Sequence, residues 1–273
     1  MTSIIKEILI KRNLICELIL KDLKIRYSRP LLGFFWAFLS PFLIVIIFYV
    51  VFSMILKVKT EEAPFLLYLM SAIFSWRFFQ DSLVCATTSL IDNKNLIKES
   101  NFPHYLIPIS IVLANAINFL PSLAIVIVTS LFTLKGLPIF VLFLPIVLSI
   151  HLAIAIGLSI ILSILYVRWR DIKYILEAAL LILFYFTPVF YSIRLVKDSF
   201  PPLLFTIYIN NPFVAILNLY RITILKDFYI YLQRYIGLSC LIVVPLGFAV
   251  VIFLFGFYFY KKNKNNINDY LSY

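Results

Sequence analysis

Two charged residues, Arg77 and Asp81, stand one helical turn apart inside an otherwise apolar stretch of the 273-residue sequence. Side chains four positions apart meet on one face of a helix. An uncompensated charge inside a lipid bilayer costs at least about 2.5 kcal/mol on insertion scales. The spacing therefore predicts an intramembrane ion pair between the Arg77 guanidinium and the Asp81 carboxylate.

The other reactive side chains form no recognisable catalytic or metal-binding pattern. The sequence contains no G-x-x-x-x-G-K-[ST] phosphate loop, no G-x-G-x-x-G fingerprint, no H-E-x-x-H and no G-x-S-x-G. Its two histidines and three cysteines lack the spacing of metal ligands, and its 13 carboxylates are scattered. We therefore expect no catalytic residue, no metal site and no cofactor in this chain.

Aromatic residues recur in two apolar stretches. In the first stretch they follow steps of 4, 4, 7 and 3 residues, which places them along one helical face: Phe34, Phe38, Phe42, Tyr49 and Phe52. A later stretch adds Phe184, Tyr185, Phe186, Phe190 and Tyr191. Aromatic faces offer stacking contacts without fixed hydrogen-bond geometry, and conduction requires binding that is weak enough to release. The pattern favours the lining of a path for a sugar polymer, with packing between helices or contact with lipid as the alternative.

The elements that position these residues follow from the composition. Apolar residues make up 63% of the chain and charged residues only 14%, and the mean hydropathy is +1.02. A soluble domain carries about 25% charged residues and 45–50% apolar residues. The solvent of this chain is therefore the lipid bilayer.

Six apolar stretches are each long enough to cross a hydrocarbon core of about 30 Å, which takes roughly 20 residues in a helix. Backbone groups in hydrocarbon must be paired internally, and these stretches lack the alternation of a membrane β-barrel. The predicted fold class is an all-α membrane protein with six transmembrane helices, at residues 34–56, 65–89, 107–133, 138–166, 173–192 and 238–260.

The segments outside these stretches have amphipathic patterns. Residues 3–27 place apolar side chains near one helical face, which is typical of an interfacial helix. Residues 193–237 hold two short apolar pieces, for which we predict short re-entrant helices before the last span. The predicted organisation is an N-terminal amphipathic interfacial segment (1–33), a six-span transmembrane domain (34–260) and a cytoplasmic tail (261–273).

The basic residues predict the orientation, because cytoplasmic loops carry the excess of Lys and Arg. With both termini inside, 15 of these residues fall on the cytoplasmic side and eight on the other, and Arg77 lies within a span. The net charge of +11 suits anionic lipid headgroups beside the spans, so we expect contact with membrane lipids and none with nucleic acid.

Residues 91–105 form the longest predicted cytoplasmic loop between spans. Four of its apolar residues are expected to be exposed among charged residues: Leu96, Ile97, Phe102 and Tyr105. They would form a small apolar knob that a cleft of a partner protein could bind. A solvated turn resting on headgroups is the alternative. At the next cytoplasmic loop, Arg170 and Asp171 either contact the same partner or extend to headgroups.

Four motifs give this chain a family resemblance. They are RYSRPLLGFFW at 26–36 followed by Pro41; WRFF at 76–79 leading to NLIK at 95–98 and Phe102-Pro103; RDI at 170–172 leading to TPVFY at 187–191; and NPF at 211–213 leading to Tyr220-Arg221. In this order, across nearly the whole chain, they resemble the type-2 ABC exporter permeases that move polysaccharides such as O-antigen, capsule or teichoic acid.

The resemblance implies a transport subunit rather than an enzyme. Its expected partners are a second copy of itself, two copies of an ABC ATPase that carry ATP and Mg, and a lipid-linked polysaccharide. It places the chain in a bacterial or archaeal cytoplasmic (inner) membrane. By resemblance, the aromatic residues line the substrate path and the re-entrant helices close an external gate. Contact of Arg77 and Asp81 with a phosphate of the lipid carrier is a separate hypothesis that the resemblance does not supply, because family members often have an uncharged residue at the position of Arg77.

The resemblance also identifies the loop with a coupling helix, which transmits ATPase motion to the spans. The expected coupling residues are Asn95, Leu96, Ile97, Lys98, Phe102, Pro103, Arg170 and Asp171. An exporter of a drug or small lipid with the same fold is the main alternative. A membrane-embedded glycan transferase would need a cluster of acidic residues or a metal motif, which the sequence does not provide.

Overall fold

The computed structural model describes residues 11–27, 35–57, 63–99 and 102–271. Within these ranges every regular element is a helix, so the predicted all-α class is confirmed for the described chain. In order the elements are α2 (Arg12–Tyr27), α3 (Trp36–Phe48), the π-helix η2 (Tyr49–Ile55), α4 (Phe65–Asp92), α5 (Lys94–Glu99), α6 (Leu106–Thr133), the 3₁₀-helix η3 (Ile139–Phe143), α7 (Leu144–Arg168), α8 (Ile172–Tyr185), α9 (Ile193–Ser199), α10 (Pro202–Ile209), α11 (Pro212–Ile224), α12 (Phe228–Leu232) and α13 (Leu238–Leu271).

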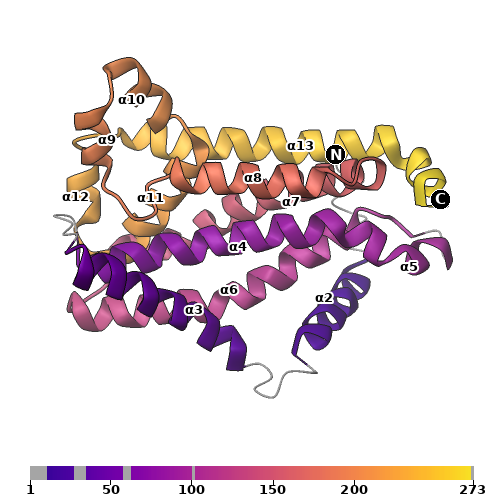
Figure 1. The fold of residues 1–273 in the computed structure, drawn as a ribbon, viewed down its shortest axis with the longest axis horizontal. Helices are drawn as coiled ribbons and strands as arrows, with labels where there is room; N and C mark the ends of the chain where they lie inside the picture. The colour runs from indigo at the N-terminus through magenta and orange to yellow at the C-terminus, as the bar shows by residue number, and fades with distance from the viewer. Residues whose placement is uncertain (1–10, 28–34, 58–62, 100–101, 272–273) are drawn as a thin grey trace.

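Five long helices, α4, α6, α7, α8 and α13, run along the long axis of the molecule (Figure 1). The short helices α9, α10 and α12 gather with α11 at one end, and α5 lies near the carboxyl end of α13 at the other. We call these the α11 end and the α5 end. Helix α2 lies beside α6 towards the α5 end, and α3 runs from that level towards the α11 end.

Three described helices are long and apolar enough to cross a membrane: α6, η3 together with α7, and the α13 portion Leu238–Lys264. A fourth passes only if α10 and α11, which meet at 67°, count as one bent span. Helices also occupy the other three predicted stretches, but α3–η2 and α8 are short, and α4 carries Arg77 and Asp81. The six-span count therefore stays a prediction.

The fifth predicted stretch, 173–192, is wrong at its carboxyl end. Helix α8 ends at Tyr185, and residues 186–191 form turns. Pro188 has no backbone N–H and disfavours a helical conformation at Thr187, which explains why the helix cannot continue. Phe190 and Tyr191 therefore belong to a turn after α8 and not to the helix.

Helices α7 and α13 pack at unusually short range. A Cβ atom placed on Gly157 would lie 2.6 Å from the Ile252 carbonyl oxygen, and one on Gly256 would lie 2.6 Å from the Gly157 carbonyl oxygen. Small residues at a helix crossing permit such close backbone approach in membranes. Helix α13 then continues beyond the predicted boundary at 260, as far as Leu271.

Candidate functional site

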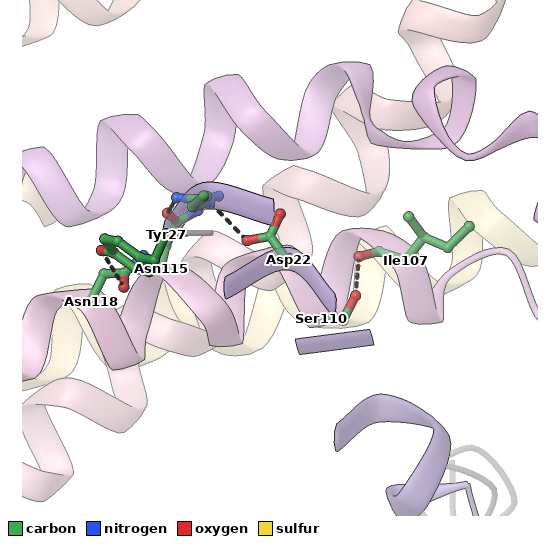
Figure 2. A network of polar contacts seen from close by, with 7 residues as sticks. Asp22, Tyr27, Ile107, Ser110, Asn115 and Asn118 are labelled. Atoms are coloured by element: carbon green, nitrogen blue, oxygen red, sulfur yellow. Dashed lines mark hydrogen bonds and ion pairs between the residues drawn. The ribbon is translucent and has the colours of Figure 1, made fainter. Parts of the chain in front are cut away.

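Helix α2 is attached to the rest of the bundle by three side-chain hydrogen bonds. At the carboxyl end of α2, Arg26 Nη1 donates to Asn115 Oδ1 of α6 at 2.7 Å, and the Tyr27 hydroxyl donates to Asn118 Oδ1 at 2.9 Å. Figure 2 shows the Tyr27–Asn118 bond. Nearer the start of α2, Lys21 Nζ donates to Asn93 Oδ1 at 2.9 Å. Helix α2 is thus anchored to its own bundle.

Arg26 also forms an ion pair inside α2. Its Nε lies 2.8 Å from Asp22 Oδ2, one turn earlier, and both side chains are partly buried. Burial raises the pKa of the Asp22 carboxyl, although the neighbouring Arg26 charge acts in the opposite direction. The Arg26 guanidinium therefore contacts both an acid of its own helix and an amide of α6.

A cavity of about 170 Å³ lies between α2, α3, α4 and α6, and we call it the inner cavity. Arg26, Arg77, Asp81 and Asn115 are among its lining residues. The structure thus brings Arg77 and Asp81 to one site, but no ion pair within 4.0 Å joins them among the described residues. The predicted ion pair is therefore not formed, and both side chains border the inner cavity.

The aromatic residues of the first predicted span divide between the surface and the interior. Phe42 and Tyr49 are exposed, whereas Phe52 packs against Phe190 with ring centroids 5.4 Å apart. Tyr49 and Phe52 lie in the π-helix η2, whose i→i+5 pairing changes the face that an α-helical spacing would predict. Phe34 and the side chain of Phe38 lie outside the described residues.

The second aromatic group surrounds the end of α8. The Phe184 ring packs against the buried Trp76 of α4, with centroids 5.8 Å apart, while Tyr185 and Phe186 are exposed. Tyr191 is partly buried, and its hydroxyl donates to the Tyr185 carbonyl at 3.0 Å. Through the Phe52–Phe190 contact, the structure joins the two aromatic groups that the sequence analysis singled out.

Helix α5 occupies the position predicted for a coupling helix, but the exposed apolar knob is wrong. Ile97 and Tyr105 are each only 4% exposed, and Leu96 and Phe102 are partly buried against the same cluster. The apolar side of this loop packs on α4, α6, α7 and α13 at the α5 end, because the bundle leaves apolar surface there. Asn95 is exposed.

The other coupling candidates lie around this cluster. Pro103 is partly buried, and the side chain of Lys98 lies outside the described residues. Arg170 and Asp171 are exposed between α7 and α8, and the Arg170 guanidinium lies 5.3 Å from the Tyr166 ring centre. The carboxyl-terminal turns of α7 share the buried cluster of Ile97, so both loops lie at the α5 end.

Arg221 of α11 is a functional candidate to which the sequence analysis gave no role beyond its place in the fourth family motif and among the basic residues of the outer side. The side chain is 0% exposed, and Nη2 donates to the carbonyl oxygens of Pro188 and Val189 at 2.5 and 3.0 Å. Its guanidinium also lies 3.5 Å from the Tyr68 ring centre. The available signal was an arginine within the apolar segment 213–225.

The described geometry is that of a helical membrane protein in which helix α2 is hydrogen-bonded to α6, with exposed aromatic residues and short helices at both ends. The sequence model of the ABC-2 type transporter matches residues 13–225, so the chain belongs to the ABC-2 type transporter family. It is a multi-pass membrane protein.

Two relatives illustrate its nearest functional context. The chain is 27% identical over 221 residues to the O-antigen export system permease protein RfbA of Myxococcus xanthus, which covers 81% of this chain and 84% of the relative. It is 29% identical over 182 residues to the protein of the same name from Klebsiella pneumoniae, covering 66% and 69% of the two chains.

Proposed function

We propose that this chain is the membrane permease of an ABC exporter that moves a lipid-linked polysaccharide, of O-antigen, capsule or teichoic acid type, outward across the cytoplasmic membrane. The observation that carries the proposal is family membership over residues 13–225 together with relatives named as O-antigen export permeases. The chain supplies the path and a separate ATPase supplies the energy, since the sequence has no phosphate loop.

The aromatic residues support a saccharide as the cargo. Phe42, Tyr49, Tyr185 and Phe186 are exposed on this chain, on segments that the Phe52–Phe190 contact holds together. Sugar rings present C–H faces that stack on aromatic rings, and such contacts let a polymer slide because no fixed hydrogen bond must break at each step. In this proposal two copies of the chain enclose the path between these surfaces.

The proposed topology has six spans, both termini in the cytoplasm and the α5 end facing the ATPase. Helices α10 and α11, which meet at 67°, dip into the outer side of the membrane as re-entrant helices and close the external gate. Two ATPase subunits bind at α5 and at the loop that contains Arg170 and Asp171. ATP and Mg bind to those subunits and not to this chain.

The path is tested by replacing Phe42, Tyr49 and Tyr185 together with alanine. Surface polysaccharide, measured by immunoblot in cells that depend on this chain, should fall at least about tenfold while the complex with its ATPase still assembles. The matched control is Phe132→Ala, which removes an aromatic ring that is 78% exposed on α6, outside the proposed path. Equal export by the triple variant and the control would remove the aromatic path.

The coupling contact is tested by disulfide or bismaleimide crosslinking. A cysteine at the exposed Asn95 should crosslink to a co-expressed ATPase subunit, because α5 lies at the end proposed to face it. A cysteine at the exposed Lys197 of α9, at the α11 end, should not. Crosslinking only from position 197 would reverse the topology.

A further inference from the structure

A second cavity lies next to the inner cavity, on the side of the α5 end. It has a volume of about 380 Å³ and is lined by α2, α4 and α6, and Arg26 borders both cavities. Asp92 and Asn93, at the end of α4, lie at its far side. We call the two cavities together the polar groove. Its lining residues extend from Asn93, at the end of α4, to Arg77 in the middle of that helix.

The charged groups in the outer part of the polar groove have partners within the protein. Lys21 donates to Asn93, and Asp92 Oδ2 accepts from the Thr88 hydroxyl at 2.6 Å. Asp22 is paired with Arg26 at 2.8 Å. The polar groups of this part of the groove therefore already have hydrogen-bond or ion-pair partners, and apolar side chains such as Leu18 and Ile107 line the rest of it, which suits passage more than tight binding.

The inner cavity differs, because two of its buried donors have no acceptor among the described residues. They are Arg77 Nη1 and Asn115 Nδ2. The Asn115 side chain is oriented by Arg26, which donates to Oδ1 and leaves the amino group as a donor. Asn115 is 4% exposed. A buried donor without an acceptor costs about 1–3 kcal/mol, so both groups favour a ligand that brings oxygen acceptors.

The charge and size of the inner cavity narrow the ligand class. Among its charged lining residues, Arg26 and Arg77 are cationic and only Asp81 is anionic. Guanidinium groups bind phosphate through parallel hydrogen bonds, and a low dielectric strengthens them. At about 170 Å³, the cavity is smaller than the roughly 300–1,000 Å³ of typical small-molecule sites. It fits a headgroup better than a whole sugar polymer.

We propose that the inner cavity binds the phosphate of a lipid headgroup that reaches it along the polar groove, with Arg77 and Asn115 donating to the phosphate oxygens. The inference deepens the proposed function and rests on it where the lipid is the phosphate-bearing carrier of the polysaccharide. An anionic phospholipid offers the same chemistry. Helix α2 is then one wall of the binding site as well as a membrane anchor.

The experiment is native mass spectrometry of the full-length chain with three lipids: polyprenyl monophosphate, phosphatidylglycerol and diacylglycerol. Polyprenyl monophosphate should be retained, diacylglycerol should not, and Arg77→Gln should weaken retention about tenfold, which corresponds to one charge-assisted hydrogen bond. Arg77→Lys, which keeps the charge, should restore part of the binding. The matched control is Arg168→Gln, which removes an exposed cation of α7 outside the polar groove.

The outcomes separate the site from the proposed function. If the chain binds phosphatidylglycerol in an Arg77-dependent manner but does not bind polyprenyl monophosphate, the result would support the phosphate site. It would also show that the site does not bind the carrier of the polysaccharide. Arg77→Gln that binds all three lipids like the wild type, while remaining monodisperse, would overturn the proposal. So would equal losses for Arg77→Gln and Arg168→Gln, because the effect would then be one of general charge.

Water access to the polar groove gives a second readout that does not depend on binding. Cys85 borders the outer part of the groove, and the other two cysteines of the chain, Cys16 and Cys240, can be replaced by serine. In that background a membrane-impermeant thiol reagent should modify Cys85, and polyprenyl monophosphate should slow the reaction. A cysteine at Val243, exposed on the apolar surface of α13, is the unreactive control. Equal reactivity at both positions would contradict a polar route.

Discussion

Arg221 at the α11 end and Arg77 in the middle of α4 are both arginines within apolar helices, but their surroundings differ. Arg221 is fully buried and donates to carbonyl oxygens of Tyr68, Pro188 and Val189. Arg77 borders a cavity, and its Nη1 has no hydrogen-bond partner among the described residues. Since an intramembrane charge is costly, each arrangement requires its own explanation.

The difference separates a structural arginine from a binding arginine. The carbonyls of Pro188 and Val189 lie in the turn after α8, where no helix satisfies them, so Arg221 holds this turn against α11 and α4. The turn carries Phe190, which contacts Phe52 of the other aromatic group. Arg221 therefore fixes the turn that carries Phe190 of the proposed path, whereas Arg77 remains available to a ligand.

The strongest test of this comparison is Arg221→Met, which should destabilise the protein by at least about 2 kcal/mol. It leaves the carbonyls of Pro188 and Val189 without this donor, at about 1–3 kcal/mol each, whereas the Tyr68 carbonyl still accepts from the Ser71 hydroxyl. The measurement is the apparent unfolding temperature and the monodisperse fraction in detergent. Arg194→Gln at the same end is the control, because its ion pair with Asp198 is exposed and contributes less than about 1 kcal/mol. Similar behaviour of the two variants would refute the structural role.

A second test asks whether the α7–α13 contact is as rigid as the surroundings of Arg221. Gly157→Ala places a methyl group 2.6 Å from the Ile252 carbonyl oxygen, so the helices must separate, at a cost of about 1–3 kcal/mol. Gly247→Ala in α13 is the control, since its Cβ meets nothing within 4 Å and alanine favours a helix by up to about 1 kcal/mol. Equal unfolding temperatures for the two variants would show that α7 and α13 can separate at this contact without loss of stability.

His104 extends the comparison to a buried polar group outside the spans, next to α6 at the α5 end. Burial, followed by the charge of Lys264, lowers the pKa of His104 below its usual 6.5. The unfolded chain therefore binds the proton more readily, so this contribution to stability is complete above about pH 7 and is lost as the pH drops through 6.5. The apparent unfolding temperature between pH 7.5 and 5.5 should fall more for the wild type than for His104→Gln. Parallel curves would exclude this contribution.

The sequence predicted the helical class and the positions of most helices, because long apolar stretches allow little else in a bilayer. The end of α8 was missed, although Pro188 was a usable signal. The buried location of Arg221 was missed because its acceptors are carbonyls of distant segments, which no local pattern contains. The inner cavity was missed for the same reason. Asn115 and Asn118 on α6 accept hydrogen bonds from Arg26 and Tyr27 only because α2 packs beside α6.

The smallest expected effect on stability completes the comparison. Arg77→Gln should destabilise the protein less than Arg221→Met, because the Nη1 donor that it removes has no protein acceptor to lose. The same substitution should reduce the retention of phosphate-bearing lipid, and export should fall with it. Arg221→Met should reduce export only in proportion to the folded complex that remains, measured as surface polysaccharide per assembled transporter. A loss of stability in Arg77→Gln comparable to that of Arg221→Met would make both arginines structural and would leave the inner cavity without a binding role.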